Sequence, residues 1–193
     1  MWTAAVGTAM AAVLAGTGAG GTTAEAGSFW LRASGQFAPP ATVLAPAAVT
    51  YDRELVPAGA EVEVAQRITD GEMAIELSVR GVLPGHAFGT HVHTRPCGPD
   101  PADSGPHYQH VEGDDSASAN PENEVWLDFR ADARGHGTAV SHHEWTFRAG
   151  GAASVVLHER ETSHGADGHA PGEAGPRAAC FTVPFAGDPA LPR

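Results

Sequence analysis

The fold is decided by the stretch Gly85-His86-Ala87-Phe88-Gly89-Thr90-His91-Val92-His93. The turn signal Pro84-Gly85 opens it, and residues 87–94 are predicted to form a β-strand. Side chains alternate between the two faces of a strand, so His91 and His93 point to the same side. Two imidazoles on one face can share a metal ion, although an isolated His-x-His is also compatible with a strand that exposes two histidines. The rest of the sequence has to decide between these interpretations.

Short segments of alternating hydrophobicity surround this stretch. Residues 61–66 alternate cleanly, Asp70-Gly71 is a hairpin turn signal, and Met73, Ile75, Leu77 and Val79 share one face of the next segment. The segments predicted to be strands are 48–55, 61–66, 73–82, 87–94, 125–129, 138–147, 154–159 and 178–185. About eight short strands joined by turns favour an all-β antiparallel sandwich or barrel.

Composition narrows the class of protein. The 193 residues suit one domain, and 24 glycines and 15 prolines without long helical periodicity favour strands joined by loops. The formal charge of −12 argues against nucleic acid as a partner. The 11 histidines equal the lysines and arginines combined, which is compatible with metal chemistry but does not demonstrate it.

The N-terminus is predicted to be a signal peptide, residues 1–26. Residues 4–14 are small and apolar, and Ala24-Glu25-Ala26 offers a cleavage site, so we expect a secreted or otherwise extracytoplasmic protein. No lysine or arginine precedes the apolar run, so a disordered Ala/Gly tail is the alternative. The run is too short for a transmembrane span. Residues 27–47 are interpreted as an irregular extension or linker, 48–186 as one domain and 187–193 as a tail.

Two long loops carry further chemically interesting residues. Residues 95–123 show no strand pattern but contain Cys97 and His107, and residues 160–176 are rich in glycine and histidine. Loops of this length in a compact domain are usually functional or disordered. The two cysteines, Cys97 and Cys180, predict one disulfide in an exported protein and two free thiols in a cytosolic one.

Several motifs resemble those of copper/zinc superoxide dismutases. The stretch that ends in His93 resembles the family's G-x-H-x-H strand. Gly105-Pro106-His107-Tyr108 is similar to the family's segment with the bridging histidine. Val155-Val156-Leu157-His158-Glu159 is similar to its strand with the last copper histidine. Gly175-Pro176-Arg177-Ala178-Ala179-Cys180 is similar to its segment with an arginine and a cysteine. The similarity covers roughly residues 48–185. It implies an eight-stranded antiparallel Greek-key β-barrel, an immunoglobulin-like sandwich with long functional loops.

The resemblance also implies a site and an activity. Copper would be bound by His91, His93, His107 and His158, and four imidazoles without a thiolate suit Cu(II) on chemical grounds as well. Superoxide would be converted to oxygen and hydrogen peroxide by Cu(II)/Cu(I) cycling, with His107 supplying a proton. Arg177 would attract the anion, although a surface arginine in a salt bridge is the simpler alternative. A Cys97–Cys180 disulfide would clamp the long loop to the last strand.

The zinc half of the family's site is not recognisable here. No His-x-x-Asp follows His107 before the next predicted strand, which favours a copper-only site. The second nitrogen of His107 then needs another partner. Glu124 and Asp128 share a strand face and are the candidates, unless both simply face solvent. A zinc site rebuilt from His110 with Asp114 or Asp115 is the alternative.

Other histidines and other functions complete the set of expectations. We interpret His86 as structural and place the following at exposed polar positions: His136, His142, His143, His164 and His169. A copper-binding or copper-delivery module on the same fold would need the four histidines but not Arg177. A non-catalytic structural relative would be expected to have lost ligands. The sequence leaves the oligomeric state open.

Overall fold

The computed structural model describes residues 28–41, 46–113, 116–166 and 168–188. The predicted signal peptide, Asp114, Asp115 and most of the predicted C-terminal tail lie outside the described residues. Within them the chain is all-β, with two short 3₁₀ helices, η1 (Pro101–Ser104) and η2 (Ser116–Ser118). Neither of these helices is long and apolar enough to cross a membrane.

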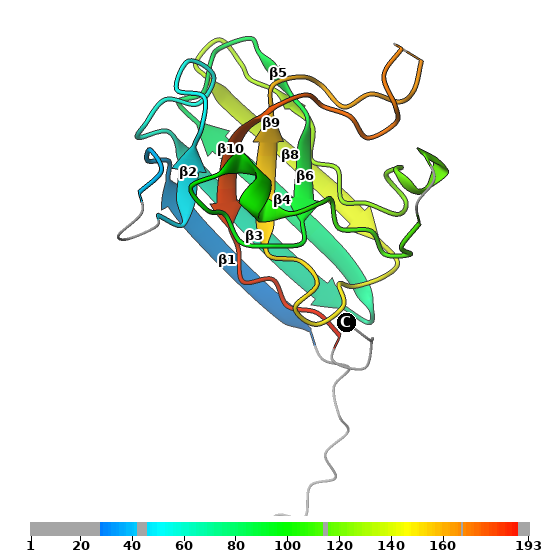
Figure 1. Ribbon diagram of the computed structural model, residues 1–193. Coiled ribbons are helices and arrows are strands. Elements are labelled where there is room, and N and C mark those ends of the chain that lie inside the picture. The colour runs from blue at the N-terminus through cyan, green and yellow to red at the C-terminus, as the bar shows by residue number, and fades with distance from the viewer. Residues whose placement is uncertain (1–27, 42–45, 114–115, 167, 189–193) are drawn as a thin grey trace, which may run out of the picture.

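Two four-stranded antiparallel sheets form the two layers of the molecule (Figure 1). The first sheet has the order β1-β3-β4-β8, the second has the order β2-β10-β9-β6, and a short ladder pairs β5 with β7. The strands are β1 (Phe29–Gln36), β2 (Ala48–Thr50), β3 (Glu61–Thr69), β4 (Glu72–Arg80), β5 (Ala87–Phe88), β6 (Thr90–His93), β7 (Phe129–Arg130), β8 (His136–His143), β9 (Ser154–His158) and β10 (Arg177–Thr182). In the described residues the ladders do not close into one barrel, and an isolated bridge between Ala38 and Val49 joins the sheets at one corner.

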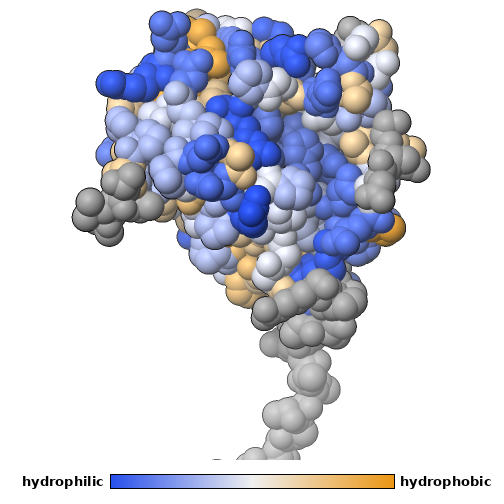
Figure 2. All heavy atoms as spheres, in the orientation of Figure 1, coloured by the Kyte–Doolittle hydropathy of each residue, from blue (hydrophilic) through white to orange (hydrophobic). Residues whose placement is uncertain are grey.

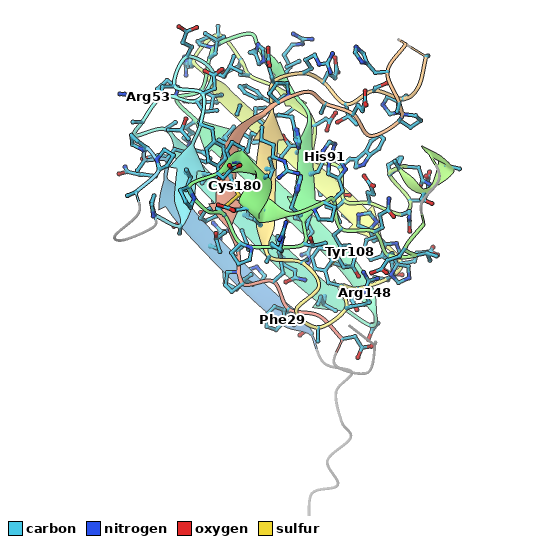
Figure 3. All side chains as sticks on the ribbon, viewed as in Figure 1. Phe29, Arg53, His91, Tyr108, Arg148 and Cys180 are labelled. Carbon is cyan, nitrogen blue, oxygen red and sulfur yellow. A yellow bond between two sulfur atoms is a disulfide. The ribbon has the colours of Figure 1, made fainter. Side chains whose placement is uncertain are left out.

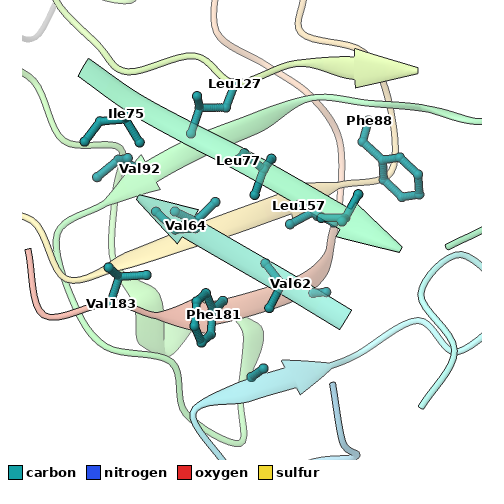
Figure 4. Close-up of a cluster of buried hydrophobic side chains, with 14 of the residues drawn as sticks. Val62, Val64, Ile75, Leu77, Phe88, Val92, Leu127, Leu157, Phe181 and Val183 are labelled. Atoms are coloured by element: carbon teal, nitrogen blue, oxygen red, sulfur yellow. The ribbon is translucent and has the colours of Figure 1, made fainter. Parts of the chain in front are cut away.

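A hydrophobic core fills the space between the two sheets (Figure 4). The predicted inward face of β4 is confirmed, because Met73, Ile75, Leu77 and Val79 are each at most 2 % exposed. Phe181 of β10 is 1 % exposed and packs against them from the second sheet. Burying one side chain of this size contributes roughly 1.5–3 kcal/mol. The core therefore gives both sheets a rigid base for the loops that they carry.

The strand β1 corrects the prediction that residues 27–47 form an irregular extension. It pairs with β3 along its whole length, from Phe29 opposite Ile68 to Gln36 opposite Glu61. The prediction was wrong because small inward residues such as Gly35 give little hydrophobic contrast along the strand. A Cβ at Gly35 would lie 3.0 Å from the Phe181 ring, so the small residue lets β1 approach the core closely.

Gly89 divides the strand predicted at residues 87–94 into β5 and β6. The first piece pairs with β7 and the second with β9. A Cβ at Gly89 would lie 2.5 Å from Ala174 Cβ and 2.8 Å from Thr162 Oγ1. The absence of a side chain therefore brings the 160–176 loop directly against the segment that carries His91 and His93.

The strand predicted at residues 125–129 is mostly an irregular segment, and only its last residue belongs to β7. Its predicted alternation is nevertheless correct. Val125 and Leu127 are fully buried in the core. Glu124 and Trp126 lie on the other face, where the Glu124 carboxylate accepts from His107 and the Trp126 ring centroid lies 5.8 Å from that of His91.

The buried position of His143 corrects its predicted exposure, whereas His136, His142, His164 and His169 are exposed as expected. His143 ends β8 at 7 % exposure, with Nε2 2.7 Å from Ser141 Oγ. Its ring packs on Trp145 with the ring centroids 4.2 Å apart. Burial, helped by the neighbouring His142 and His110, lowers the pKa of His143 to about 4.

Acid should therefore destabilise the protein through His143, and His143→Gln should reduce this effect. A histidine in the unfolded chain titrates near pH 6.5, so between about pH 6.5 and 4 the unfolded chain binds a proton that the folded chain does not. The contribution of His143 to the free energy of unfolding should fall by up to about 3 kcal/mol across this window, and no further below it. Urea unfolding of the metal-free protein across the window measures the slope. Equal slopes in the wild type and the variant would contradict this account.

Candidate metal centre

The four predicted ligands lie together. His91 and His93 are on β6, His158 ends β9 beside it, and His107 follows η1 and bridges back to His93. One nitrogen from each of the four lies within 4.8 Å of the others. His91 and His93 are fully buried and His158 is 5 % exposed. In Figure 3 His91 lies in the same layer of the molecule as Cys180.

Hydrogen bonds decide which nitrogen of each ring carries a proton. His93 Nδ1 lies 2.9 Å from the Gly105 carbonyl and His158 Nδ1 lies 3.0 Å from the Gly175 carbonyl. A carbonyl only accepts, so each Nδ1 donates and each Nε2 is bare. His107 Nδ1 likewise donates to Glu124 Oε2 over 2.9 Å.

His91 carries its proton on Nε2 instead of Nδ1. Its Nε2 lies 2.8 Å from Thr162 Oγ1, whose own proton goes to Asp128 Oδ1 over 2.8 Å. The Thr162 hydroxyl therefore accepts from His91 Nε2, which leaves Nδ1 bare. That buried Nδ1 has no hydrogen-bond partner.

The four bare nitrogens fit a metal cation. His93 Nε2 and His158 Nε2 face each other at 3.3 Å, and with both protons elsewhere they present two lone pairs to one another. Such an arrangement is stabilised by a cation that both lone pairs can bind. Burial, followed by the neighbouring histidines, lowers the pKa of His91 well below its usual range. Burial also lowers the pKa of His158 to about 4. His91 and His158 are thus neutral, as metal ligation requires, and an all-nitrogen donor set suits copper.

Glu124 lies behind His107, where the sequence placed it as a candidate. It is 1 % exposed, and Oε2 accepts from both His107 Nδ1 and Trp126 Nε1. Oε1 accepts from Gln109 Nε2 over 2.9 Å. Burial alone would raise the pKa of Glu124, but these donors outweigh it and the pKa is lowered. The carboxylate is therefore ionised and fixed.

Asp128, the other candidate partner of the His107 nitrogen, forms its hydrogen bonds elsewhere. It accepts from the backbone N–H groups of Thr90 and Thr162 and from the Thr162 hydroxyl. Its effect on the site runs through Thr162 to His91, whose Nε2 lies 3.9 Å from Asp128 Oδ1. Sequence analysis missed Thr162, because a threonine in a long loop carries no distinctive signal.

Arg177 and the disulfide join the long loop to the last strand. Cys97 and Cys180 are bonded across 83 residues of sequence. Arg177 Nη1 donates to the Pro101 carbonyl and to Ser104 Oγ, and Nη2 donates to the Gly105 carbonyl over 2.6 Å. The same Gly105 carbonyl accepts from His93, so the arginine and a histidine share one anchor.

A second cation fixes the segment that follows His107. Arg148 lies beside Tyr108 (Figure 3), with its guanidinium carbon 4.6 Å from the ring centroid. Its Nη1 donates to the carbonyls of Gln109 and His110. This network ties residues 108–110, and His107 just before them, to the segment between β8 and β9.

A cavity of about 470 Å³ opens beside the histidines. His107, His158, Arg160, Glu173 and Arg177 are among the residues that line it. Hydrophilic side chains dominate the face shown in Figure 2. Two arginines against one carboxylate make this cavity locally positive in a protein of formal charge −12, which favours a small anion.

His110 lies apart from the cluster. Its ring stacks on Trp145 with an interplanar angle of 8°. In the part of the chain that the structure describes, the only His, Cys, Asp and Glu group able to hold a metal is the four-histidine cluster. The suggested partners of His110 in the alternative zinc site, Asp114 and Asp115, lie outside the described residues.

Comparisons with known proteins identify the family. The profile described as copper/zinc superoxide dismutase (SODC) matches residues 59–183. No curated protein matches the chain. Among solved structures, the crystal structure of a SOD-like protein from Bacillus subtilis has a TM-score of 0.48 and 14 % identity, covering 63 % of this chain and 88 % of that chain. A double mutant of a SOD-like protein from Bacillus subtilis has a TM-score of 0.48 and 17 % identity, with coverages of 62 % and 86 %.

The family profile covers more than half of the chain and includes all four clustered histidines. The chain therefore belongs to the copper/zinc superoxide dismutase family.

Proposed function

We propose that the protein is an exported superoxide dismutase that uses copper. The observation that carries the proposal is the convergence of four bare imidazole nitrogens beside a cavity with two arginines. The ligands are His91 through Nδ1 and His93, His107 and His158 through Nε2. A buried redox metal next to a positive cavity suits a small anionic substrate, and superoxide is the substrate expected for the family.

Copper, when bound, supplies a one-electron couple by which one superoxide is oxidised to oxygen and a second is reduced to peroxide. His91, His93 and His158 hold their positions because the opposite nitrogen of each ring is tied to a fixed acceptor. His107 differs, because its side chain is 20 % exposed and lines the cavity. When its Nε2 is not holding the metal, that nitrogen can take up a proton from solvent in the cavity and pass it to the product, while Nδ1 stays bonded to Glu124.

Arg177 attracts and orients the anion in this proposal. A guanidinium remains protonated at any working pH and its position is fixed by three hydrogen bonds. Arg160 lines the same cavity. Local charge matters here because charges more than about 8–10 Å apart are screened at physiological salt.

The proposal includes copper without stoichiometric zinc. The nitrogen of His107 that faces away from the cluster is occupied by Glu124, whose other donors, Gln109 and Trp126, are neutral. A zinc ion at this place would have to displace these hydrogen bonds. The carboxylate thus supplies the orienting partner for His107.

The proposal extends to the architecture and the compartment. We assign the two sheets to the eight-stranded Greek-key barrel of the family. In the described residues the hydrogen-bonded ladders form separate sheets and do not close the barrel. The Cys97–Cys180 disulfide supports an oxidising compartment and hence the predicted signal peptide.

A copper-binding or copper-delivery module is the second candidate. One observation favours it: the hydrogen bonds of Arg177 all go to residues 101–105, so this arginine has a structural task in addition to any role with substrate. The two candidates differ in whether the charge of Arg177 affects turnover.

Replacing a ligand should abolish both copper binding and activity. His91→Ala and His158→Ala each remove one of four donors, so copper affinity should fall by more than about 100-fold, beyond what changing the groups behind a ligand usually costs. Competition titration and the copper spectrum measure the loss. His136→Ala, at an exposed position on β8, is the matched control. Full activity in either ligand variant would defeat the assignment.

Reconstitution with copper and zinc together should give one copper per chain and no tightly held zinc beside it. The reason is that Glu124, Gln109 and Trp126 already complete the surroundings of His107. Elemental analysis after dialysis decides the question. One zinc retained per chain in addition to copper would show that the second metal site exists.

Changing the charge of Arg177 should slow turnover without releasing copper. Arg177→Lys should retain most of the rate, Arg177→Ala should lose about tenfold and Arg177→Glu more, with the difference shrinking as salt rises. Stopped-flow decay of superoxide with copper occupancy measured in parallel tests this. The exposed Arg53, which is not among the cavity residues, provides the control Arg53→Glu. A wild-type rate in Arg177→Glu would show that the arginine is structural and does not guide the anion.

A further inference from the structure

Trp126 contacts one proposed ligand, His91, and the carboxylate that supports another, His107. Its indole Nε1 donates to Glu124 Oε2 over 2.9 Å, the same oxygen that accepts from His107 Nδ1. Its ring centroid lies 5.8 Å from that of His91. Its backbone also forms an isolated antiparallel bridge with His91.

The hydrogen-bond chemistry of the indole explains what this contact does. A carboxylate that bonded only to His107 could rotate and present either oxygen, or tilt away from the ring plane. Gln109 fixes Oε1 and Trp126 fixes Oε2, so the carboxylate has one orientation. An indole N–H donates and never accepts. Trp126 therefore cannot take the proton of His107, and it leaves the second lone pair of Oε2 for that proton.

The surroundings of Trp126 point to the site rather than to the core. Trp126 is partly buried and is absent from the hydrophobic core cluster. It lines a cavity of about 220 Å³ with His164 and Pro171. A Cβ at Gly172 would lie 3.8 Å from Glu124 Oε2 and 3.9 Å from Trp126 Cζ2, so the 160–176 loop covers both groups together. Trp126 and Glu124 thus form one unit under this loop.

We propose that Trp126 is a positioning residue for His107, acting through Glu124. By fixing Glu124 it holds His107 as the Nδ1–H tautomer and keeps Nε2 bare toward the other three histidines. For copper this inference rests on the proposed function, but the tautomer of His107 can be tested without any metal.

The variant Trp126→Phe keeps an aromatic ring and removes only the N–H donor. In the metal-free protein, ¹⁵N NMR of the histidine side chains should show one Nδ1–H tautomer of His107 in the wild type and a mixture in the variant. After copper loading, the variant should bind copper about 10–100-fold more weakly, the range typical of groups that orient ligands. Its copper EPR spectrum should change, while the melting temperature of the metal-free protein stays close to the wild-type value.

Trp145→Phe is the matched control. Trp145 is also partly buried and donates its indole N–H, but to the Glu122 carbonyl, and it contacts none of the four histidines of the cluster. It should leave the His107 tautomer and the copper spectrum unchanged. In a Glu124→Gln background, Trp126→Phe should add little to the loss of copper affinity, because both changes interrupt the same connection.

Several results would overturn the inference. A single Nδ1–H tautomer in Trp126→Phe, or full additivity with Glu124→Gln, would show that Trp126 does not act through Glu124. If Trp126→Phe does not fold, the indole N–H resonance of Trp126 is compared between the wild type and Glu124→Gln, and an unchanged resonance contradicts the proposal. A wild type that binds no copper would defeat the proposed function, while the metal-free tautomer measurement would still decide the role of Trp126.

Discussion

The structure of the site depends on keeping the buried imidazoles neutral and on fixing which nitrogen of each of the four rings faces the cluster. Burial does the first, because it penalises the charged form and lowers the pKa values of His91, His93 and His158. Fixed acceptors do the second: two backbone carbonyls, one hydroxyl and one carboxylate. A neutral imidazole without such a partner would exchange between two tautomers, one of which directs its proton toward the metal.

The acceptors come from loops, so the loops have to be as rigid as the sheets. The Cys97–Cys180 disulfide attaches the loop after β6 to β10. Arg177 adds three hydrogen bonds to the same loop and shares the Gly105 carbonyl with His93. The 160–176 loop is held against β6 where Gly89 has no side chain, and it delivers both Thr162 and the Gly175 carbonyl. Each loop is therefore tied to a strand within a few residues of the group that it supplies.

His107 stands out among the four. The other three are buried and supported by neutral groups, although the support of His91 is itself bonded to Asp128. His107 is partly exposed at the cavity and bonded directly to an ionised carboxylate. The carboxylate fixes the orientation of the ring that we propose exchanges a proton with product. The same carboxylate occupies the nitrogen that a second metal would need, and this supports the proposal of a copper-only site.

The sequence by itself determined the all-β class, the inward face of β4 and the four histidines, because period-two alternation and short motifs are local signals. It also named Glu124 and the cysteine pair. Only the tertiary structure decided that Phe29–Gln36 is a strand, since small residues gave no contrast, and that His143 is buried, since its burial depends on Trp145. Thr162, Gln109 and Trp126 could not be found from the sequence. Each of them matters because it hydrogen-bonds a side chain of the site, either His91 or Glu124. These partners lie between 2 and 71 positions away in the sequence, and only the folded chain brings them within hydrogen-bond distance.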